Sequence, residues 1–197
     1  MSTYTIPSVV ERLSSGGERV TDVFSRLLSD RIVYVGTPID DDVANTVIAQ
    51  LLHLESASPD EPVDLTLNSS GGDPSAVLAV VDTMRYVRCP VRVTCVGQAV
   101  AASALVLASG RPGSRTVLRH ARVVLAPVQA QARGAVPDLI LQADEVERVR
   151  AETEAVLARA TGRAPEQVRE DTARQRVLTA EDAVRYGIAD EVLDRRR

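Results

Sequence analysis

The sequence of 197 residues predicts an α/β fold built from stacked strand–turn–helix units, on three observations. Short β-branched runs alternate with segments whose apolar residues recur at helical spacing. Three predicted strands begin near residues 63, 91 and 122, and the spacing of about thirty residues is the length of one crossover unit. No Gly/Ser-rich or Pro-rich linker divides the sequence, so we expect one domain over residues 1–197.

The first unit follows an N-terminal segment and a first helix, which together take up about residues 1–30. Residues 31–36 form a short β-branched run and predict a strand. Three consecutive acidic residues, Asp40 to Asp42, then cap the next helix and offset its dipole. A metal site is disfavoured there because oxygen cages need spaced ligands and turn glycines. The apolar positions of this helix are Val43, Val47, Ile48, Leu51 and Leu52.

Two further units repeat the pattern. A strand over residues 63–67 leads through a turn at 68–72 into a helix from about 73 to 88, which Pro90 ends. A strand over 91–96 leads through a turn at 97–99 into a short helix of small residues, from about 101 to 109. Two strands follow, over 115–118 and 122–126.

A long amphipathic helix is predicted from Pro137 to Ala160, with Gly162 as its C′ residue. Its length of about 36 Å at 1.5 Å per residue is too great for so small a domain. We therefore expect an arm that packs against a partner subunit, the alternative being a lone surface helix. The apolar face consists of Leu139, Val146, Val149, Val156 and Ala160.

The C-terminal part contains two short helices and a last strand. The first helix runs from Pro165 to Thr172. The second begins at a capping box formed by residues 179–182, with Asp182 in place of the usual Glu, and ends at Gly187. The last strand covers residues 188–193, and Arg195 to Arg197 are expected to form a solvated tail.

Composition limits the chemistry. All 23 basic residues are Arg, against 27 acidic residues, so the formal charge is −4 and a Schiff-base lysine is excluded. His53 and His120 are the two general-base candidates with an unperturbed pKa near neutrality. The net negative charge and the 3% aromatic content disfavour nucleic acid as a partner. Residues 99–108 are too short an apolar run to span a membrane.

The N-terminus lacks the pattern of a signal peptide, so we expect neither export nor membrane insertion. Two cysteines, Cys89 and Cys95, fit no disulfide framework or zinc spacing, which favours a reducing, cytoplasmic compartment.

Seven stretches of the sequence resemble the Clp protease proteolytic subunit family, ClpP. They follow one another in the same order as in the family, and no insertion is needed between them. The resemblance implies a crotonase-like α/β fold with a handle at about residues 127–160. It also implies seven-membered rings stacked in pairs around a chamber. An ATP-driven unfoldase of the ClpX, ClpA or ClpC kind would deliver substrates to that chamber. No cofactor and no metal are implied. The stretches are residues 22–31, 49–52, 68–72, 82–85, 97–99, 171–172 and 183–187.

The resemblance also implies a serine–histidine–aspartate triad, but this sequence departs from it at all three positions. The family's Gly-Gln-Ala-Ala-Ser motif matches residues 97–101 and places Ala101 at the nucleophile. The strand that ends in the family's histidine ends here in Ala126, and the family's aspartate is replaced by Gln175. We therefore expect a pseudoenzyme.

Three residues could supply the missing chemistry, and none is well placed. Ser103 lies two residues beyond Ala101, which on a helix is about 200° of rotation, so it should point away from the site. His120 lies six residues before Ala126, about 20 Å in an extended chain. His53 stands among leucines at helical spacing and is expected to be structural.

Other family positions are partly retained. Gly71, Gly72 and Ala102 match the oxyanion hole, and they form either a cleft for an extended peptide or a structural turn. Arg174 matches the arginine that joins the two rings, whereas residues 127–131 lack the family's paired glycines. The positions that receive hydrophobic loops of the unfoldase carry Asp64, Thr66 and Thr94 beside Tyr86 and Leu118, so we expect weak docking.

Several functional hypotheses follow. The first is a silent subunit that assembles with itself or with active paralogues, much like the serine-less ClpR-type subunits. The second is an active peptidase with Ser103 as a relocated nucleophile. The third is a decoy or resistance protein that binds inhibitors or partners of the active enzyme. Acyl-CoA chemistry at the Gly72/Ala102 cleft is disfavoured because no acid or base is visible there.

Overall fold

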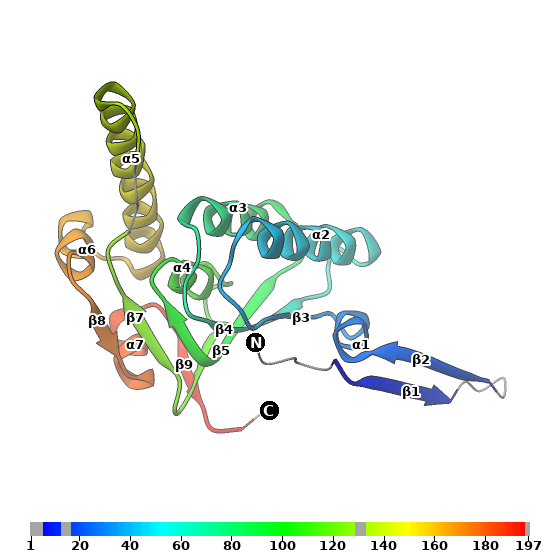
Figure 1. The fold of residues 1–197 in the computed structure, drawn as a ribbon. Helices are drawn as coiled ribbons and strands as arrows, with labels where there is room; N and C mark the ends of the chain where they lie inside the picture. Colours follow the sequence, from blue (N-terminus) through cyan, green and yellow to red (C-terminus); the bar gives the residue numbers. More distant parts are fainter. Residues whose placement is uncertain (1–5, 13–16, 129–132, 196–197) are drawn as a thin grey trace.

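A mixed sheet forms the centre of the computed structural model, which describes residues 6–12, 17–128 and 133–195 (Figure 1). Within these residues the sheet has seven strands, and β3, β4 and β5 run parallel. This arrangement confirms the predicted α/β class. The strands are β3 (Ile32–Val35), β4 (Val63–Ser69), β5 (Val91–Val100), β6 (Arg115–Leu118), β7 (Arg122–Leu125), β8 (Arg176–Leu178) and β9 (Glu191–Leu193).

The long strand β5 divides the sheet. The first half of β5 pairs with β6, and β6 pairs in turn with β9. The second half of β5 pairs with β7, and β7 pairs in turn with the antiparallel strand β8. The sequence analysis wrongly placed a turn at residues 97–99. The strand continues to Val100 because β7 offers it a second partner, and a register shift opposite Ser69 absorbs the change.

Helices cover one face of the sheet, where α2 and α3 lie side by side (Figure 1). Along β4, Val63, Leu65 and Leu67 are buried against them, while the alternate residues are less buried. Such alternation follows from the two-residue period of a strand. The helices are α1 (Val23–Ser29), α2 (Asp41–Ala57), α3 (Pro74–Tyr86), α4 (Ser103–Ala108), α5 (Val136–Thr161), α6 (Pro165–Thr172) and α7 (Ala180–Tyr186).

Several predicted helix ends are confirmed. The Asp40 side chain accepts a hydrogen bond from the Val43 N–H, as an N-cap does. Gly162 ends α5 in the left-handed conformation, and Thr179 and Asp182 form the predicted capping box. Leu52 was wrongly assigned to the buried face of α2, because Leu54 takes that place and Leu52 is 41% exposed.

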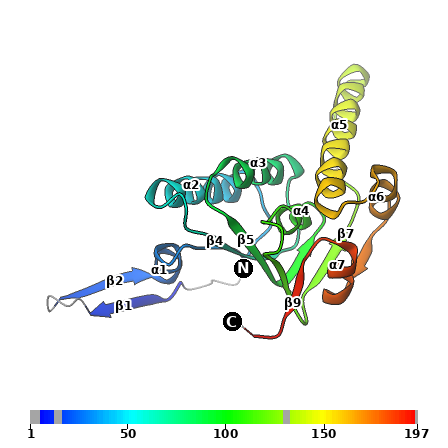
Figure 2. The same ribbon diagram turned by 180° about the vertical axis from the view of Figure 1, so that it is seen from behind.

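Two parts of the chain extend from the body in different directions. Helix α5 projects at one end, and a hairpin of β1 (Ser8–Arg12) and β2 (Glu18–Asp22) extends at the other (Figures 1 and 2). The sequence analysis missed this hairpin. On α5 the buried residues lie between Val149 and Ala158, whereas Leu139 and Val146 of the predicted apolar face are only partly buried. The N-terminal half stands free of the body, as an arm does (Figure 1), and its packing against a partner subunit stays a prediction.

An ion pair between Arg115 and Asp190 links β6 to the residue that precedes the C-terminal strand β9. Arg115 on β6 is buried, and its Nε donates to the Asp190 carboxylate at 3.0 Å, while its backbone N–H donates to the same oxygen at 2.9 Å. Burial alone raises the pKa of Asp190, but the hydrogen bonds from Arg115 outweigh it, so the pKa lies below its ordinary value.

We expect Asp190→Asn to destabilise the folded chain by about 2 kcal/mol at pH 7, because hydrogen bonds to a charged group are lost. The loss should shrink as the pH falls below about 4, because a carboxyl with a depressed pKa contributes its full stability above the pKa of the unfolded carboxyl and loses it as the pH falls through the pKa of the folded one. Urea unfolding between pH 3 and pH 7 measures this. Asp194→Asn is the matched control, because its pair with Arg119 is exposed and should matter less. An equal effect of both substitutions would contradict the prediction.

Candidate functional site

A cavity of about 510 Å³ opens where β4, β5 and β7 end. Because these strands are parallel, their carboxyl ends meet at one edge of the sheet. The residues that follow them, 70–72, 100–102 and 125–128, form one side of the cavity, together with the start of α4. Helix α5 contributes residues 150, 153, 154 and 157, and Thr172 and Gln175 complete the lining.

The three positions that resemble the family's triad line this same cavity: Ala101, Ala126 and Gln175. The backbone explains why they converge. The Ala101 N–H donates to the Val124 carbonyl at 2.8 Å, which ties position 101 to β7. Leu125 on β7 is opposite Arg176 on β8, so one further step of the antiparallel register places Ala126 beside Gln175.

Position 101 has an unusual backbone. Ala101 adopts φ +50°, the left-handed region that a residue with a Cβ rarely enters. It lies between the end of β5 and the start of α4, where the chain turns sharply from strand to helix. Strain of this kind persists only where the surrounding structure enforces it, and it often marks a functional turn. The methyl group of Ala101 has no chemistry that would use such a turn.

The neighbouring turn at residues 69–72 has a fixed shape. The buried Ser69 hydroxyl donates to the Gly71 carbonyl at 2.9 Å, and the Gly71 N–H lies 3.3 Å from the same hydroxyl oxygen. Gly72 adopts φ +143° and forms a parallel bridge with Ile39. A Cβ at Gly72 would lie 2.2 Å from the Ile39 carbonyl oxygen, so the close approach needs glycine.

Two backbone donors border the cavity. Across the described ranges, neither the Gly72 N–H nor the Ala102 N–H forms a hydrogen bond. These are the two positions that resemble the oxyanion hole, and both residues line the cavity. Unpaired N–H groups in a cavity favour an acceptor or an anion.

Ser103 does not share this cavity. It is fully buried, and its Oγ accepts from the Val100 N–H at 2.8 Å and lies 3.2 Å from the Ser69 carbonyl oxygen. The Ser103 hydroxyl thus links the last residue of β4 to the last residue of β5. Ser103 is absent from the cavity lining, but not through the predicted helical rotation, because α4 begins at Ser103 and Ala101 has a left-handed backbone.

The two histidines also lie elsewhere. His53 is exposed on α2, so the expectation of a packed structural side chain was wrong, because Leu51 and Leu54 occupy the buried face. His120 is exposed between β6 and β7. Neither lines the cavity, and its described lining contains no His, Cys or Asp.

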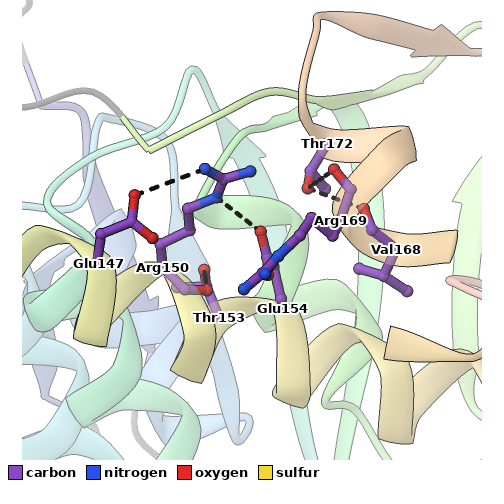
Figure 3. A network of polar contacts seen from close by, with 7 residues as sticks. All are labelled: Glu147, Arg150, Thr153, Glu154, Val168, Arg169 and Thr172. Atoms are coloured by element: carbon purple, nitrogen blue, oxygen red, sulfur yellow. Dashed lines mark hydrogen bonds and ion pairs between the residues drawn. The ribbon is translucent and has the colours of Figure 1, made fainter. Parts of the chain in front are cut away.

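Sequence reasoning missed a charged cluster on the cavity wall (Figure 3). Glu154 on α5 has a side chain only 7% exposed. Its Oε1 accepts from Arg150 Nε at 2.8 Å, and its Oε2 accepts from Arg169 Nε on α6 at 2.9 Å. The hydrogen bond and the charge of Glu154 raise the pKa of Arg169 further. The i, i+4 spacing of Arg150 and Glu154 was the available sequence signal.

Three hydroxyl groups also line the cavity, those of Ser70, Thr153 and Thr172. The Thr153 hydroxyl donates to the Arg150 carbonyl at 2.8 Å, and the Thr172 hydroxyl donates to the Val168 carbonyl at 2.8 Å. An alcohol is a weak nucleophile without an adjacent base. The one carboxylate of the lining, Glu154, already accepts from two guanidinium groups, so it does not activate them.

Four of the five predicted docking positions lie on strands, where they alternate with the buried residues: Asp64, Thr66, Thr94 and Leu118. Asp64 on β4 is held by Arg92 on β5 through two hydrogen bonds of 2.6 Å. Thr94 bonds to Thr116 at 2.8 Å, and its cross-strand neighbour is Thr66. Leu118 is partly buried on β6, whereas Tyr86 is 78% exposed at the end of α3.

Arg174 is exposed between α6 and β8. Of the segment 127–131, residues 129–131 lie outside the described residues, as do Arg196 and Arg197 of the predicted tail.

Two kinds of feature are absent from residues 6–12, 17–128 and 133–195. No group of three or more His, Cys, Asp or Glu side chains is arranged to hold a metal ion there, and this includes the run from Asp40 to Asp42. Nor do these ranges contain a helix with the length and apolar character that a membrane span requires.

Comparison with known proteins gives a consistent result. The model of the family described as Clp protease matches residues 15–196. The chain is similar to ATP-dependent Clp protease proteolytic subunit 1 of Nocardia farcinica, at 58% identity over 100% of both chains. Subunit 2 of Streptomyces avermitilis is 53% identical, over 100% of this chain and 98% of its own length.

A third relative has the same kind of name. ATP-dependent Clp protease proteolytic subunit 4 of Rhodococcus jostii is 50% identical, over 98% of this chain and 99% of its own length. Both the family match and these identities extend over almost the whole sequence. The chain therefore belongs to the Clp protease family.

Proposed function

We propose that this chain is a catalytically silent member of the Clp protease family that assembles with active subunits and modulates their protease. The observation that carries the proposal is that one cavity is lined by Ala101, Ala126 and Gln175, the residues to which the family resemblance assigns the nucleophile, base and orienting positions. Acyl transfer by a serine peptidase needs a nucleophile with a base in hydrogen-bond reach. The cavity supplies neither, but it keeps two free N–H donors that suit a peptide carbonyl.

Assembly with other subunits is supported by the exposed half of α5. Val136, Ile140 and Leu141 are 70%, 58% and 68% exposed there, and apolar groups on a projecting helix favour a partner. The family resemblance implies paired seven-membered rings in the cytoplasm. Relatives named proteolytic subunit 1, 2 and 4 support a setting with several distinct subunits, so we infer a mixed particle.

We further infer that unfoldase docking falls to the partner ring. Polar pairs occupy the surface where the family receives hydrophobic loops: Asp64 with Arg92, and Thr94 with Thr116. Desolvating the charged pair opposes the docking of an apolar loop. Native mass spectrometry of the chain, alone and mixed with a triad-bearing relative, tests the assembly. The absence of any mixed particle would count against it.

The purified chain is expected to hydrolyse fluorogenic peptides about 10⁶-fold more slowly than a triad-bearing relative, the loss known for removal of a complete triad. It is also expected to take up no serine-directed fluorophosphonate probe. Peptide turnover and mass spectrometry of the probe-treated chain measure these two outcomes.

Ser103→Ala is the informative variant. We expect this variant to have lower thermal stability, because the Val100 N–H loses its hydrogen-bond acceptor. We expect its peptide turnover to equal that of the inactive wild-type chain. Probe adduct on Ser103, or turnover that Ser103→Ala abolishes, would overturn the proposal in favour of a relocated nucleophile.

A further inference from the structure

The charged cluster on the cavity wall has no role in the proposed function. Glu154 is buried between the guanidinium groups of Arg150 and Arg169, and the exposed Glu147 pairs with Arg150 at 3.8 Å, so the four charges of the cluster balance (Figure 3). Both carboxylate oxygens of Glu154 already accept a hydrogen bond from an arginine. The buried part of the cluster therefore offers a ligand the donors of arginine rather than the oxygens of Glu154.

Arg150 is the member of the cluster with donors to spare in the cavity. It lines the cavity, and its side chain is 28% exposed. Its Nε is used by Glu154, while its Nη1 lies 3.8 Å from Glu147 Oε1, which is too long for a hydrogen bond. Within the described part of the chain, the Nη1 and Nη2 groups of Arg150 donate no hydrogen bond. Arg169 does not line the cavity.

Glu154 fixes where Arg150 points. The side chain of Arg150 lies between Glu147 and Glu154, and the Nε bond to the buried carboxylate holds the guanidinium plane in place (Figure 3). An arginine held in this way loses little further entropy when a ligand arrives. Its remaining N–H groups have the geometry that a carboxylate prefers.

We propose that this cavity prefers ligands that carry a carboxylate, and that Arg150 is the residue that receives it. The inference rests on the proposed peptide cleft and names the class of peptide that it takes. The free N–H groups of Gly72 and Ala102 lie on the same cavity and favour the same sign of charge. In a peptide the carboxylate comes from an Asp or Glu side chain or from the C-terminus.

Four peptides of one Ala-rich sequence, each labelled with the same neutral fluorophore that has no carboxylate, distinguish these sources. They carry either Glu or Gln at a central position, and each ends in either a free carboxylate or an amide. Fluorescence anisotropy with the purified chain, in the assembly that it forms, measures their affinities. We expect the better carboxylate peptide to bind about 10-fold more tightly than the Gln amide peptide, as for a charged hydrogen bond. Equal affinity of all four overturns the inference.

Variants on α5 assign the preference to Arg150. Arg150→Gln is expected to reduce the 10-fold preference to less than about 2-fold, since the charge and the fork of donors are lost. Arg150→Lys keeps a charge beside the buried Glu154, which protects the fold, and should retain a smaller preference. Arg148→Gln is the matched control, because Arg148 is exposed on the same helix and does not line the cavity. An unchanged preference in both Arg150 variants would contradict the assignment.

The same measurements separate this inference from the proposed function. If none of the peptides binds, the peptide cleft and its preference are both wrong. If they bind without regard to charge, only the carboxylate preference is wrong. If mass spectrometry shows that the wild-type chain cleaves them, catalytic silence is wrong, while the ratio of affinities still tests Arg150.

Discussion

The triple variant Ala101→Ser, Ala126→His, Gln175→Asp is expected to hydrolyse peptides at least about 10³-fold faster than the wild-type chain. A complete triad is worth about 10⁶ in kcat, and the margin allows for imperfect placement of the new side chains. The backbone favours the experiment, because all three positions line one cavity and Ala101 keeps its left-handed turn. Initial rates with a fluorogenic peptide that carries Glu residues measure the gain.

Two partial variants show whether the gain is triad chemistry. Ala126→His with Gln175→Asp lacks the nucleophile and should remain as inactive as the wild-type chain. Ala101→Ser with Ala126→His keeps Gln175, and because an amide in the orienting position costs about 10⁴ in kcat, this variant should lose most or all of the gain of the triple variant. A fluorophosphonate probe should label position 101 in the triple variant. A folded triple variant without label or turnover would show that this scaffold no longer positions a triad.

The regular elements of the fold were predictable because their signals are local. The alternation along β4, the Asp40 cap and the Gly162 stop depend on residues close in sequence. The extension of β5 was not predictable in this way, because it depends on pairing with β7, more than twenty residues away. The hairpin of β1 and β2 had a local signal, two β-branched runs flanking Gly16 and Gly17, that was not used.

In the candidate site, too, some residues were predictable from the sequence and others were not. Motif order alone led to Ala101, Ala126 and Gln175, and their shared cavity follows from strand ends that meet at one edge. The cluster around Glu154 was missed because helical periodicity assigns charged residues to the solvated face. Arg169 reaches the buried Glu154 from α6, a contact between two helices that no local pattern reports.

Gly72→Ala is expected to destabilise the folded chain by about 3 kcal/mol or more. A residue with a Cβ at φ +143° is strained by about 1–3 kcal/mol, and overlap with fixed atoms adds about 1–3 kcal/mol. The overlap is severe because a Cβ would lie 2.2 Å from the Ile39 carbonyl oxygen and 2.5 Å from the Ile39 nitrogen, which are backbone atoms. For a domain of this size the loss corresponds to a fall in Tm of about 6–12 °C.

Comparison of Gly72→Ala with Gly113→Ala separates the free-energy cost of steric overlap from the cost of a strained backbone conformation. Gly113 also has a positive φ, +81°, but no heavy atom lies within 4 Å of a Cβ built there. Gly113→Ala should therefore show the conformational cost alone, about 1 kcal/mol, which differential scanning calorimetry distinguishes from the larger loss at Gly72. Equal losses would mean that Ile39 moves aside and that the 69–72 turn is adaptable. A turn of that kind would not hold the backbone of Gly72 in a fixed position beside the cavity, so this comparison also tests the rigidity that a preorganised peptide cleft requires.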